Sequence, residues 1–292
     1  MHSYIRTIGF LNYTKKEFHD FLYHQAMNMP DVIEIAMDND GNEMVELRKE
    51  VALGMGIAMR GEYDENNQFV MDYYFPYREA DNISSSSYTE IVRMSDKNCF
   101  LGVSDDLRLG VDLVFFIQDM LPLLESDQSD SQSVFFSGIS LMGLATEGKI
   151  LLPIIKNDSN INKTKQRALK RIDLLAAARE GDEKAFEQLT LSDMDVYSNI
   201  AKRIETEDVY SIVGSTFMPN GIETDKYAVL GDIMEVKKYV NHFSMQTMFE
   251  LLLDVNEMKF HVCINEKDLF GEPEVGRRFK GNVWMQGKVN AF

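Results

Sequence analysis

Near the C-terminus, two glycines and two arginines have almost the spacing of a phosphate-binding loop. Gly271 and Gly276 are separated by four residues, and Arg277 and Arg278 follow directly. A loop of this class needs a lysine and then a serine or threonine at those two positions, followed by a helix whose N-terminus helps to hold the phosphate. Pro273 also lacks a backbone N–H that could bind phosphate. These differences exclude a phosphate-binding loop of this class.

The residues after this turn alternate between apolar and polar side chains. The segment RFKGNVWMQGKV has the period of a strand, and no helix is expected there. Basic and aromatic side chains on one strand face can neutralise and stack on single-stranded nucleic acid. The candidate binding residues are therefore Arg277, Arg278, Lys280 and Trp284. The alternative is that this face is solvated or faces another domain, with Trp284 packed against a neighbouring element.

The other residues that could carry chemistry form no recognisable constellation. His261 and Cys263 share a face of the segment KFHVCIN, but no CxxC or HxxxH pair accompanies them, and burial explains them equally well. Two of four aspartates could form an acid–base pair, but nothing in their spacing distinguishes them from ordinary charged surface residues. They are Asp105, Asp106, Asp112 and Asp119. No nucleophile elbow and no dinucleotide-binding fingerprint occurs. The sequence therefore predicts no metal site and no cofactor.

The composition is that of a globular protein in a reducing compartment. The chain has 292 residues, of which 45% are hydrophobic and 26% are charged, so it can bury a core without disulfides. Its two cysteines are far apart, which is typical of intracellular proteins. The N-terminus does not resemble a secretory signal, and no stretch approaches the roughly 18 apolar residues of a spanning helix. We expect a cytoplasmic protein that does not enter a membrane.

The net charge restricts the class of partner. It amounts to −17, and most of the excess acid lies in residues 1–162. Such a surface repels phosphate backbones and anionic lipids. This argues against nucleic acid and membranes as partners and leaves a protein partner or self-association open.

Residues 1–160 are expected to form an acidic α+β domain. Phe18, Phe21 and Leu22 recur at helical spacing and predict an amphipathic helix over residues 15–27. Strands are predicted for the segments DVIEIAMD, VALGMGIAMRGEYD, QFVMDYYFPY, SVFFSGISLMGLA and KILLPII, with a hairpin turn at DENN. GVDLVFFIQDMLPLLE fits either a strand or a helix, and ESDQSDSQS predicts a mobile surface loop over residues 125–133.

Residues 161–292 are expected to form a second domain, because the polar stretch KNDSNINKT over residues 156–164 resembles a linker. The domain is predicted to begin with helices broken at Gly181, including a third helix capped by Ser192. The segments YAVLGDIMEVKKYV, MQTMFELLLDVN, KFHVCIN and RRFKGNVWMQGKV then predict strands. The expected fold class is α+β. An N-terminal, mainly antiparallel sheet with a helix precedes a C-terminal helical segment and a small antiparallel sheet or a barrel like that of oligonucleotide/oligosaccharide-binding proteins.

Three long segments carry a resemblance to a known family. They are HSYIRTIGF, LTLSDMDVYSNIAKRIETEDVYSIVGSTFMPNGIETDKYAVLGDI and CINEKDLFGEPEVGRRFKGNVWMQG. They resemble the family catalogued as domain of unknown function 3881, from clostridia-like anaerobic bacteria, over what is essentially the whole chain. The resemblance implies a bacterial cytoplasmic protein whose two halves belong together. It assigns no activity, ligand or catalytic residue.

These observations leave three functional hypotheses. The leading one is a non-enzymatic binding or interaction protein, because no catalytic constellation accompanies the aromatic and basic strand face. The second is an enzyme with an Asp/Glu-based site in the N-terminal domain or the interdomain cleft, which a pocket holding a carboxylate of raised pKa would support. The third is single-stranded nucleic-acid binding through the C-terminal β domain.

Overall fold

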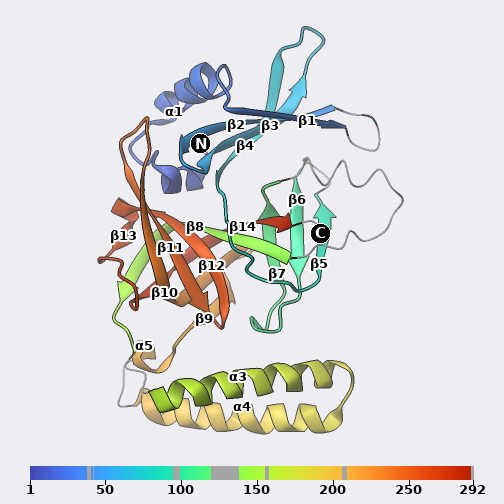
Figure 1. Cartoon of the computed structure of the whole chain (residues 1–292), viewed down its shortest axis with the longest axis vertical. Coiled ribbons are helices and arrows are strands. Elements are labelled where there is room, and N and C mark those ends of the chain that lie inside the picture. The colour runs from blue at the N-terminus through green and yellow to red at the C-terminus, as the bar shows by residue number, and fades with distance from the viewer. Residues whose placement is uncertain are drawn as a thin grey trace.

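The computed structural model describes residues 1–37, 41, 43–94, 99–119, 138–154, 158–205 and 209–290. Within these residues the protein is an α+β structure, which confirms the fold class at that level. A four-stranded sheet, shown in blue, lies beside a ten-stranded sheet, part of which closes into a barrel (Figure 1). No helix in the described part of the chain is both long and apolar enough to span a bilayer.

The N-terminal segment forms three short helices: the 3-10 helix η1 (Ser3–Ile8), the α-helix α1 (Lys15–Phe21) and the π-helix η2 (Leu22–Ala26). The predicted amphipathic helix is therefore confirmed. It begins at a capping box, in which Thr14 and Glu17 satisfy each other's backbone N–H groups. Its apolar side buries Phe18, Phe21 and Leu22, each of which contributes roughly 1.5–3 kcal/mol by leaving water.

The first sheet is antiparallel throughout, in the order β1 (Val32–Met37), β2 (Glu43–Ala52), β3 (Met55–Tyr63) and β4 (Phe69–Arg78). The predicted DENN hairpin joins β3 to β4, where the Asp64 carboxylate accepts the backbone N–H groups of Asn66 and Gln68. The single strand predicted over residues 51–64 is wrong. The chain reverses at Gly54, whose φ of 61° a residue with a side chain adopts only with strain, so residues 51–52 belong to β2.

Five strands of the second sheet close on themselves in the order β8–β12–β11–β10–β14 and back to β8. Their bounds are β8 (Gly138–Leu151), β10 (Lys226–Val240), β11 (Thr247–Val255), β12 (Met258–Asn265) and β14 (Arg278–Asn290). The two separate strands predicted between residues 133 and 155 are one strand from Gly138 to Leu151. The barrel thus combines a strand from residues 1–160 with four from residues 161–292, and the proposed boundary between two domains stays a prediction.

The other described strands are β5 (Thr89–Arg93), β6 (Phe100–Ser104), β7 (Leu113–Ile117), β9 (Thr216–Pro219) and β13 (Leu269–Phe270). They pair with strands of the barrel or with one another: β7 pairs with β14, β9 with β10 and β13 with β8, and β6 and β5 follow β7. The segment that fitted either a strand or a helix is a strand in its described part, namely β7. The expected loop over residues 125–133 lies outside the described residues.

Three helices connect β8 to β9: α3 (Asp158–Arg179), α4 (Glu183–Ile204) and the single turn α5 (Val209–Ile212). The break at Gly181 separates α3 from α4, which lie side by side at one end of the molecule (Figure 1). The predicted cap at Ser192 is wrong, because α4 continues through it. The expected linker over residues 156–164 is helical from Asp158 onward.

The buried apolar side chains of the described residues form two hydrophobic cores. The first fills the barrel with fully buried side chains such as Leu251, Phe260 and Phe279. The second lies between the outside of the barrel, the four-stranded sheet and the N-terminal helices, and it includes Phe18, Met59 and other apolar side chains of those elements. The outer surface of β8 and β14 is therefore buried at one end of these strands and exposed at the other.

Candidate functional site

A groove of about 680 Å³ lies on the exposed part of the barrel surface, over β8, β14 and β10. The turn α5 and the short strand β13 contribute its sides through Tyr210 and Phe270. Its floor is made by strand residues whose side chains point away from the barrel core. Leu230 and Ala228 supply an apolar part, and the polar part comes from β8 and β14. We call this cavity the lysine groove, after the two lysines described next.

Strand register places two lysines next to each other in the lysine groove. Lys149 on β8 is paired directly with Lys280 on β14, and the next outward-facing pair along the strands is Glu147 with Asn282. Side chains directly opposite each other on antiparallel strands lie about 4.5–5.5 Å apart at Cβ. Both lysines are exposed. The groove therefore carries two adjacent ammonium groups on one wall.

The carboxylates of the groove are bound to other groups. The Asn282 amide donates to Glu147 Oε1 at 2.9 Å, and Arg6 forms an ion pair with Asp268. Lys280 Nζ donates to the Tyr210 hydroxyl and lies 4.6 Å from the centre of that ring. Within the described residues, neither Lys149 nor Lys280 forms an ion pair. Among the described residues, no carboxylate lies within hydrogen-bonding distance of either ammonium group, and this uncompensated positive charge favours an anionic ligand.

Of the four residues predicted to bind, Lys280 alone lines this groove. Arg277, in the turn before β14, pairs with Glu274 at 2.9 Å. Arg278 is buried and donates to the backbone oxygens of Leu152 and Val213, both at 3.0 Å. These two arginines hold the chain around the start of β14.

Trp284 lies in an aromatic cluster on the buried part of β14. It is 6% exposed, and its indole N–H donates to the Asp225 carboxylate at 2.7 Å. The rings of Tyr4 and Phe116 lie 5.2 Å and 5.4 Å from it. The structure thus places Trp284 and Lys280 in different surroundings. Lys149 and Tyr210, which complete the groove, were not predicted, because the pattern of one segment does not contain cross-strand register.

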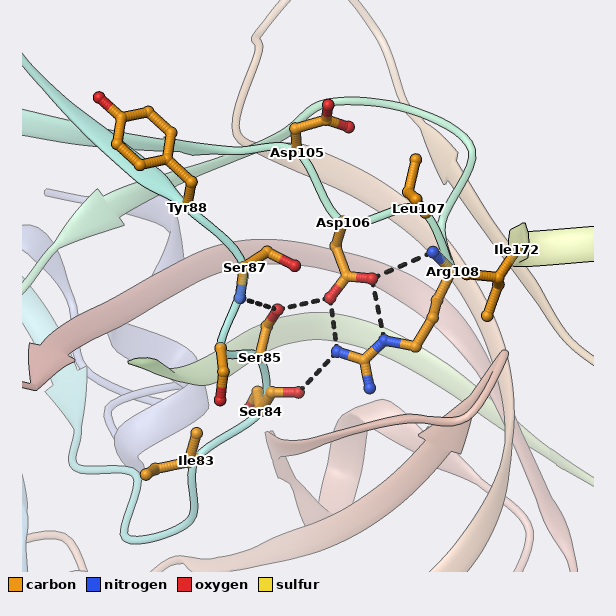
Figure 2. Close-up of a pocket in the computed structure, with 11 residues that line it drawn as sticks. Ile83, Ser84, Ser85, Ser87, Tyr88, Asp105, Asp106, Leu107, Arg108 and Ile172 are labelled. Carbon is orange, nitrogen blue, oxygen red and sulfur yellow. Dashed lines mark hydrogen bonds and ion pairs between the residues drawn. The ribbon is translucent and has the colours of Figure 1, made fainter. Parts of the chain in front are cut away.

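A second cavity of about 580 Å³ lies between the serine-rich segment after β4, the turn after β6, and Ile172 of α3 (Figure 2). Its centre is Asp106, whose carboxylate accepts from Ser85 Oγ at 2.5 Å and from Arg108 Nε at 2.9 Å. Burial raises the pKa of Asp106, but hydrogen bonds from Arg108 and Ser85 outweigh burial and hold the pKa below its usual value. An acid of low pKa is a poor proton acceptor, so this cluster fixes the turn and does not activate Ser85.

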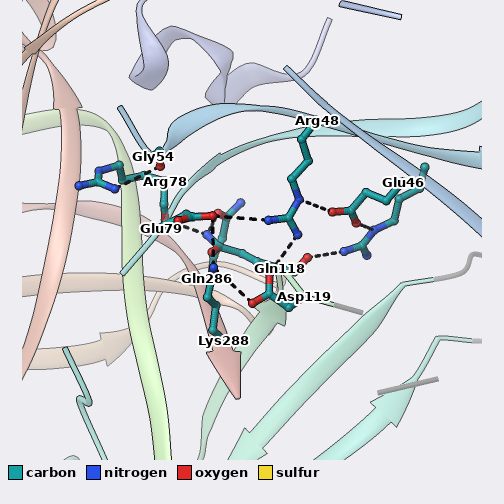
Figure 3. Close-up of polar contacts among 10 residues, drawn as sticks. Glu46, Arg48, Gly54, Arg78, Glu79, Gln118, Asp119, Gln286 and Lys288 are labelled. Atoms are coloured by element: carbon teal, nitrogen blue, oxygen red, sulfur yellow. Dashed lines mark hydrogen bonds and ion pairs between the residues drawn. The ribbon is translucent and has the colours of Figure 1, made fainter. Parts of the chain in front are cut away.

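Charged residues also fill the space between the four-stranded sheet and the barrel (Figure 3). Glu46 accepts from Arg48 Nε and from Arg60 Nε, both at 2.5 Å. Arg48 continues to Asp119 at 3.0 Å, and Lys288 of β14 lies 3.3 Å from the same carboxylate. Acids and bases alternate along this chain of contacts. Glu79 pairs with both Arg48 and Lys288, so three acids balance three bases among these contacts, and the network joins the two sheets.

His261 and Cys263 lie on the outer face of β12, as their alternation predicts. His261 Nδ1 is 3.1 Å from Glu250, and Nε2 is 3.2 Å from the Asn82 amide. Burial raises the pKa of the Cys263 thiol, so the thiol stays protonated. No group of three or more potential metal ligands occurs among the residues that the structure describes.

Among the residues that the structure describes, the carboxyl groups of Asp225 and Glu34 have a raised pKa, but neither lines the two cavities described above. Burial is the main cause for both Asp225 and Glu34. Asp225 is bound to the Trp284 indole, and Glu34 lies on β1. The arrangement that would support an acid–base enzyme, a raised carboxyl pKa inside a pocket, is thus not present in either cavity.

A comparison with protein families matches residues 5–287, nearly the whole chain. The matching model is described as "Domain of unknown function, E. rectale Gene description (DUF3881)". No curated protein and no solved structure matches the chain.

Proposed function

The chain belongs to the DUF3881 family, and we propose that it is a non-enzymatic cytoplasmic binding protein whose lysine groove holds a small anionic ligand. The observation that carries the proposal is the cross-strand pair of Lys149 and Lys280. Like charges directly opposite each other destabilise a sheet. A bound phosphate or carboxylate group between the two ammonium groups would remove this repulsion and gain charge-assisted hydrogen bonds.

The rest of the lysine groove fits an anion attached to a larger group. Leu230 and Phe270 offer apolar surface, and Phe270 is 76% exposed at the side of the groove. Asn282 and Glu147 supply polar atoms beside the lysines. Ligand sites of this kind combine a mostly apolar lining with a few polar groups that fix orientation. A phosphorylated or carboxylated small molecule matches this combination.

We interpret the barrel as like that of oligonucleotide/oligosaccharide-binding proteins, in circularly permuted form. If β10, β11, β12, β14 and β8 are numbered one to five, each strand has the same neighbours in the barrel as the strand with that number in the fold. The fold binds its ligands mainly over its second and third strands, which correspond here to β11 and β12. That face is occupied, since Cys263 and Asn265 donate hydrogen bonds to the backbone oxygens of Thr7 and Arg6. The lysine groove lies on other strands, so fold likeness alone does not predict an oligonucleotide ligand.

The proposal is tested by isothermal titration calorimetry, in which the whole protein is titrated at low salt with inorganic phosphate, pyrophosphate and a mononucleotide in turn. We expect at least one of these anions to bind, and Lys149→Gln and Lys280→Gln each to raise its Kd about tenfold or more, because a hydrogen bond to a charged group contributes about 1.5–3 kcal/mol. Lys16→Gln, which changes an exposed lysine on α1, is the control and should leave Kd unchanged. Mass spectrometry should recover the ligand unaltered.

Two results would overturn this proposal. The first is that none of the three anions binds, or that the double lysine variant binds them as the unaltered protein does. The second is binding of a single-stranded oligonucleotide without binding of any small anion, which would favour the nucleic-acid hypothesis.

A further inference from the structure

Strand β1 forms one edge of the four-stranded sheet, and it carries an exposed apolar stripe. Ile33, Ile35 and Met37 point to the same face and are 54%, 51% and 54% exposed. β1 pairs with β2 on one side, and no described strand pairs with its other side. Natural edge strands usually carry charges or proline that prevent pairing with another chain. Glu34 is the single charged residue of β1, and it lies on the opposite face from the stripe.

The β1 stripe continues a face of the sheet that is otherwise covered. Ile33 is paired with Leu47, and Ile35 is paired with Val45. These two partners on β2 are only 2% and 1% exposed, because they belong to the core that includes the N-terminal helices. Among the described residues, this cover ends at β2 and does not reach β1. The stripe is therefore the uncovered margin of a hydrophobic core, and a strand added at this edge would extend the covered face.

We propose that β1 pairs edge to edge, in antiparallel orientation, with β1 of a second copy of this chain. An edge strand gains affinity from main-chain hydrogen bonds when another strand is added to it. A second copy supplies a strand with the same apolar stripe, and a two-fold axis perpendicular to the sheet keeps both stripes on one face. The joined strands form one continuous eight-stranded sheet.

The sequence of β1 selects one register for this pairing. In two registers, both stripes lie on the same face of the joined sheet and five residues of each β1 strand are paired. One is centred on Glu34 and the other on Ile35. The register centred on Glu34 places two carboxylates directly opposite each other, which destabilises a sheet. The register centred on Ile35 instead pairs Ile35 with its copy, Ile33 with Met37, and Glu34 with Ala36. A slip by one residue would put the two stripes on opposite faces. The chemistry of β1 therefore favours the register centred on Ile35.

The first test is the mass of the whole protein in solution as a function of concentration, measured by analytical ultracentrifugation. We expect a reversible monomer–dimer equilibrium, because a single pair of short strands makes a small interface. Ile35→Lys should raise the dimer dissociation constant at least about tenfold, since it places two ammonium groups opposite each other. Ile222→Lys is the control: Ile222 is fully exposed, lies outside any strand, and should leave the constant unchanged. A circular dichroism spectrum identical to that of the unaltered protein checks that each variant is folded.

The second test reads the register. In a Cys99→Ser background, Ile35→Cys should form a disulfide-linked dimer under mild oxidation, because each residue 35 lies opposite its own copy. Glu34→Cys should not, because each residue 34 lies opposite residue 36. A protein that stays monomeric at all concentrations overturns the proposal, and so does a dimer that Ile35→Lys leaves intact. Cross-linking through residue 34 in preference to residue 35 overturns the assigned register.

Discussion

Glu46 provides the most direct test of how the two sheets are joined. Its side chain is 1% exposed and accepts hydrogen bonds from both Arg48 and Arg60. Arg60 is also fully buried, and it donates further to the backbone oxygen of Gln118 at 2.5 Å and to the Tyr73 hydroxyl at 3.1 Å. The substitution Glu46→Gln keeps the shape of the side chain but removes the negative charge from between two guanidinium groups.

The expected loss of stability is large. Breaking a buried ion pair by removing one partner costs about 3–5 kcal/mol, because the remaining charge stays buried without compensation. Globular domains have a total unfolding free energy of about 5–15 kcal/mol, so Glu46→Gln should remove a substantial part of it. The corresponding fall in Tm is on the order of 10 °C for a chain of this size.

Urea unfolding at pH 7, followed by circular dichroism, measures this loss. Glu266→Gln is the matched control, because Glu266 pairs with Lys238 at the surface, where both side chains are about half exposed. An exposed pair contributes about 0–1 kcal/mol. If Glu46→Gln lowers the unfolding free energy no more than Glu266→Gln does, the buried network does not hold the sheets together.

Three further predictions concern other parts of the fold. Gly102→Ala should cost about 1–3 kcal/mol in urea unfolding, because the added Cβ would lie 2.2 Å from the Phe115 ring. Burial raises the pKa of Glu250, but its histidine and arginine neighbours outweigh burial and hold the pKa below its usual value. Stability from Glu250 is therefore present above its unfolded pKa and lost as pH falls through the lower folded pKa, so the urea-measured difference between Glu250→Gln and the unaltered protein should shrink below about pH 4.3. Finally, Lys149→Thr should raise the stability of the ligand-free protein by about 0.2–1 kcal/mol in the same assay, because it removes a like-charged cross-strand pair.

Most strands could be predicted from the sequence, because each alternates within its own segment. The four strands predicted after residue 225 are all present as β10, β11, β12 and β14. What joins them could not be predicted in the same way. β8 closes the barrel by pairing with β12 in parallel orientation and with β14 in antiparallel orientation. The sequence of β8 does not indicate which strands it pairs with.

Glycines account for two of the errors in the predicted strands. Gly148 interrupts the apolar pattern and makes β8 look like two strands. In the structure the glycine lies within one strand, because a Cβ at this position would be 2.5 Å from the Phe279 ring inside the barrel. Its role is to leave room for that ring. Gly54 has the opposite effect, because it reverses the chain within a run that looks like one strand. A glycine that makes space and a glycine that makes a turn have the same appearance in a sequence.

The lysine groove depends on an irregularity that alternation cannot reveal. Ile139, Leu141 and Ala145 point into the barrel core, and continued alternation would turn Glu147 and Lys149 inward as well. The register between β8 and β14 shifts at this point: Asn282 pairs with Glu147 and Val283 pairs with Ala145, which leaves Thr146 as an extra residue on β8. Such a bulge reverses the direction of every following side chain. It sends Glu147 and Lys149 outward, where β14, which keeps its alternation, already presents Asn282 and Lys280. The two charges that define the groove therefore meet because one residue of β8 is unpaired.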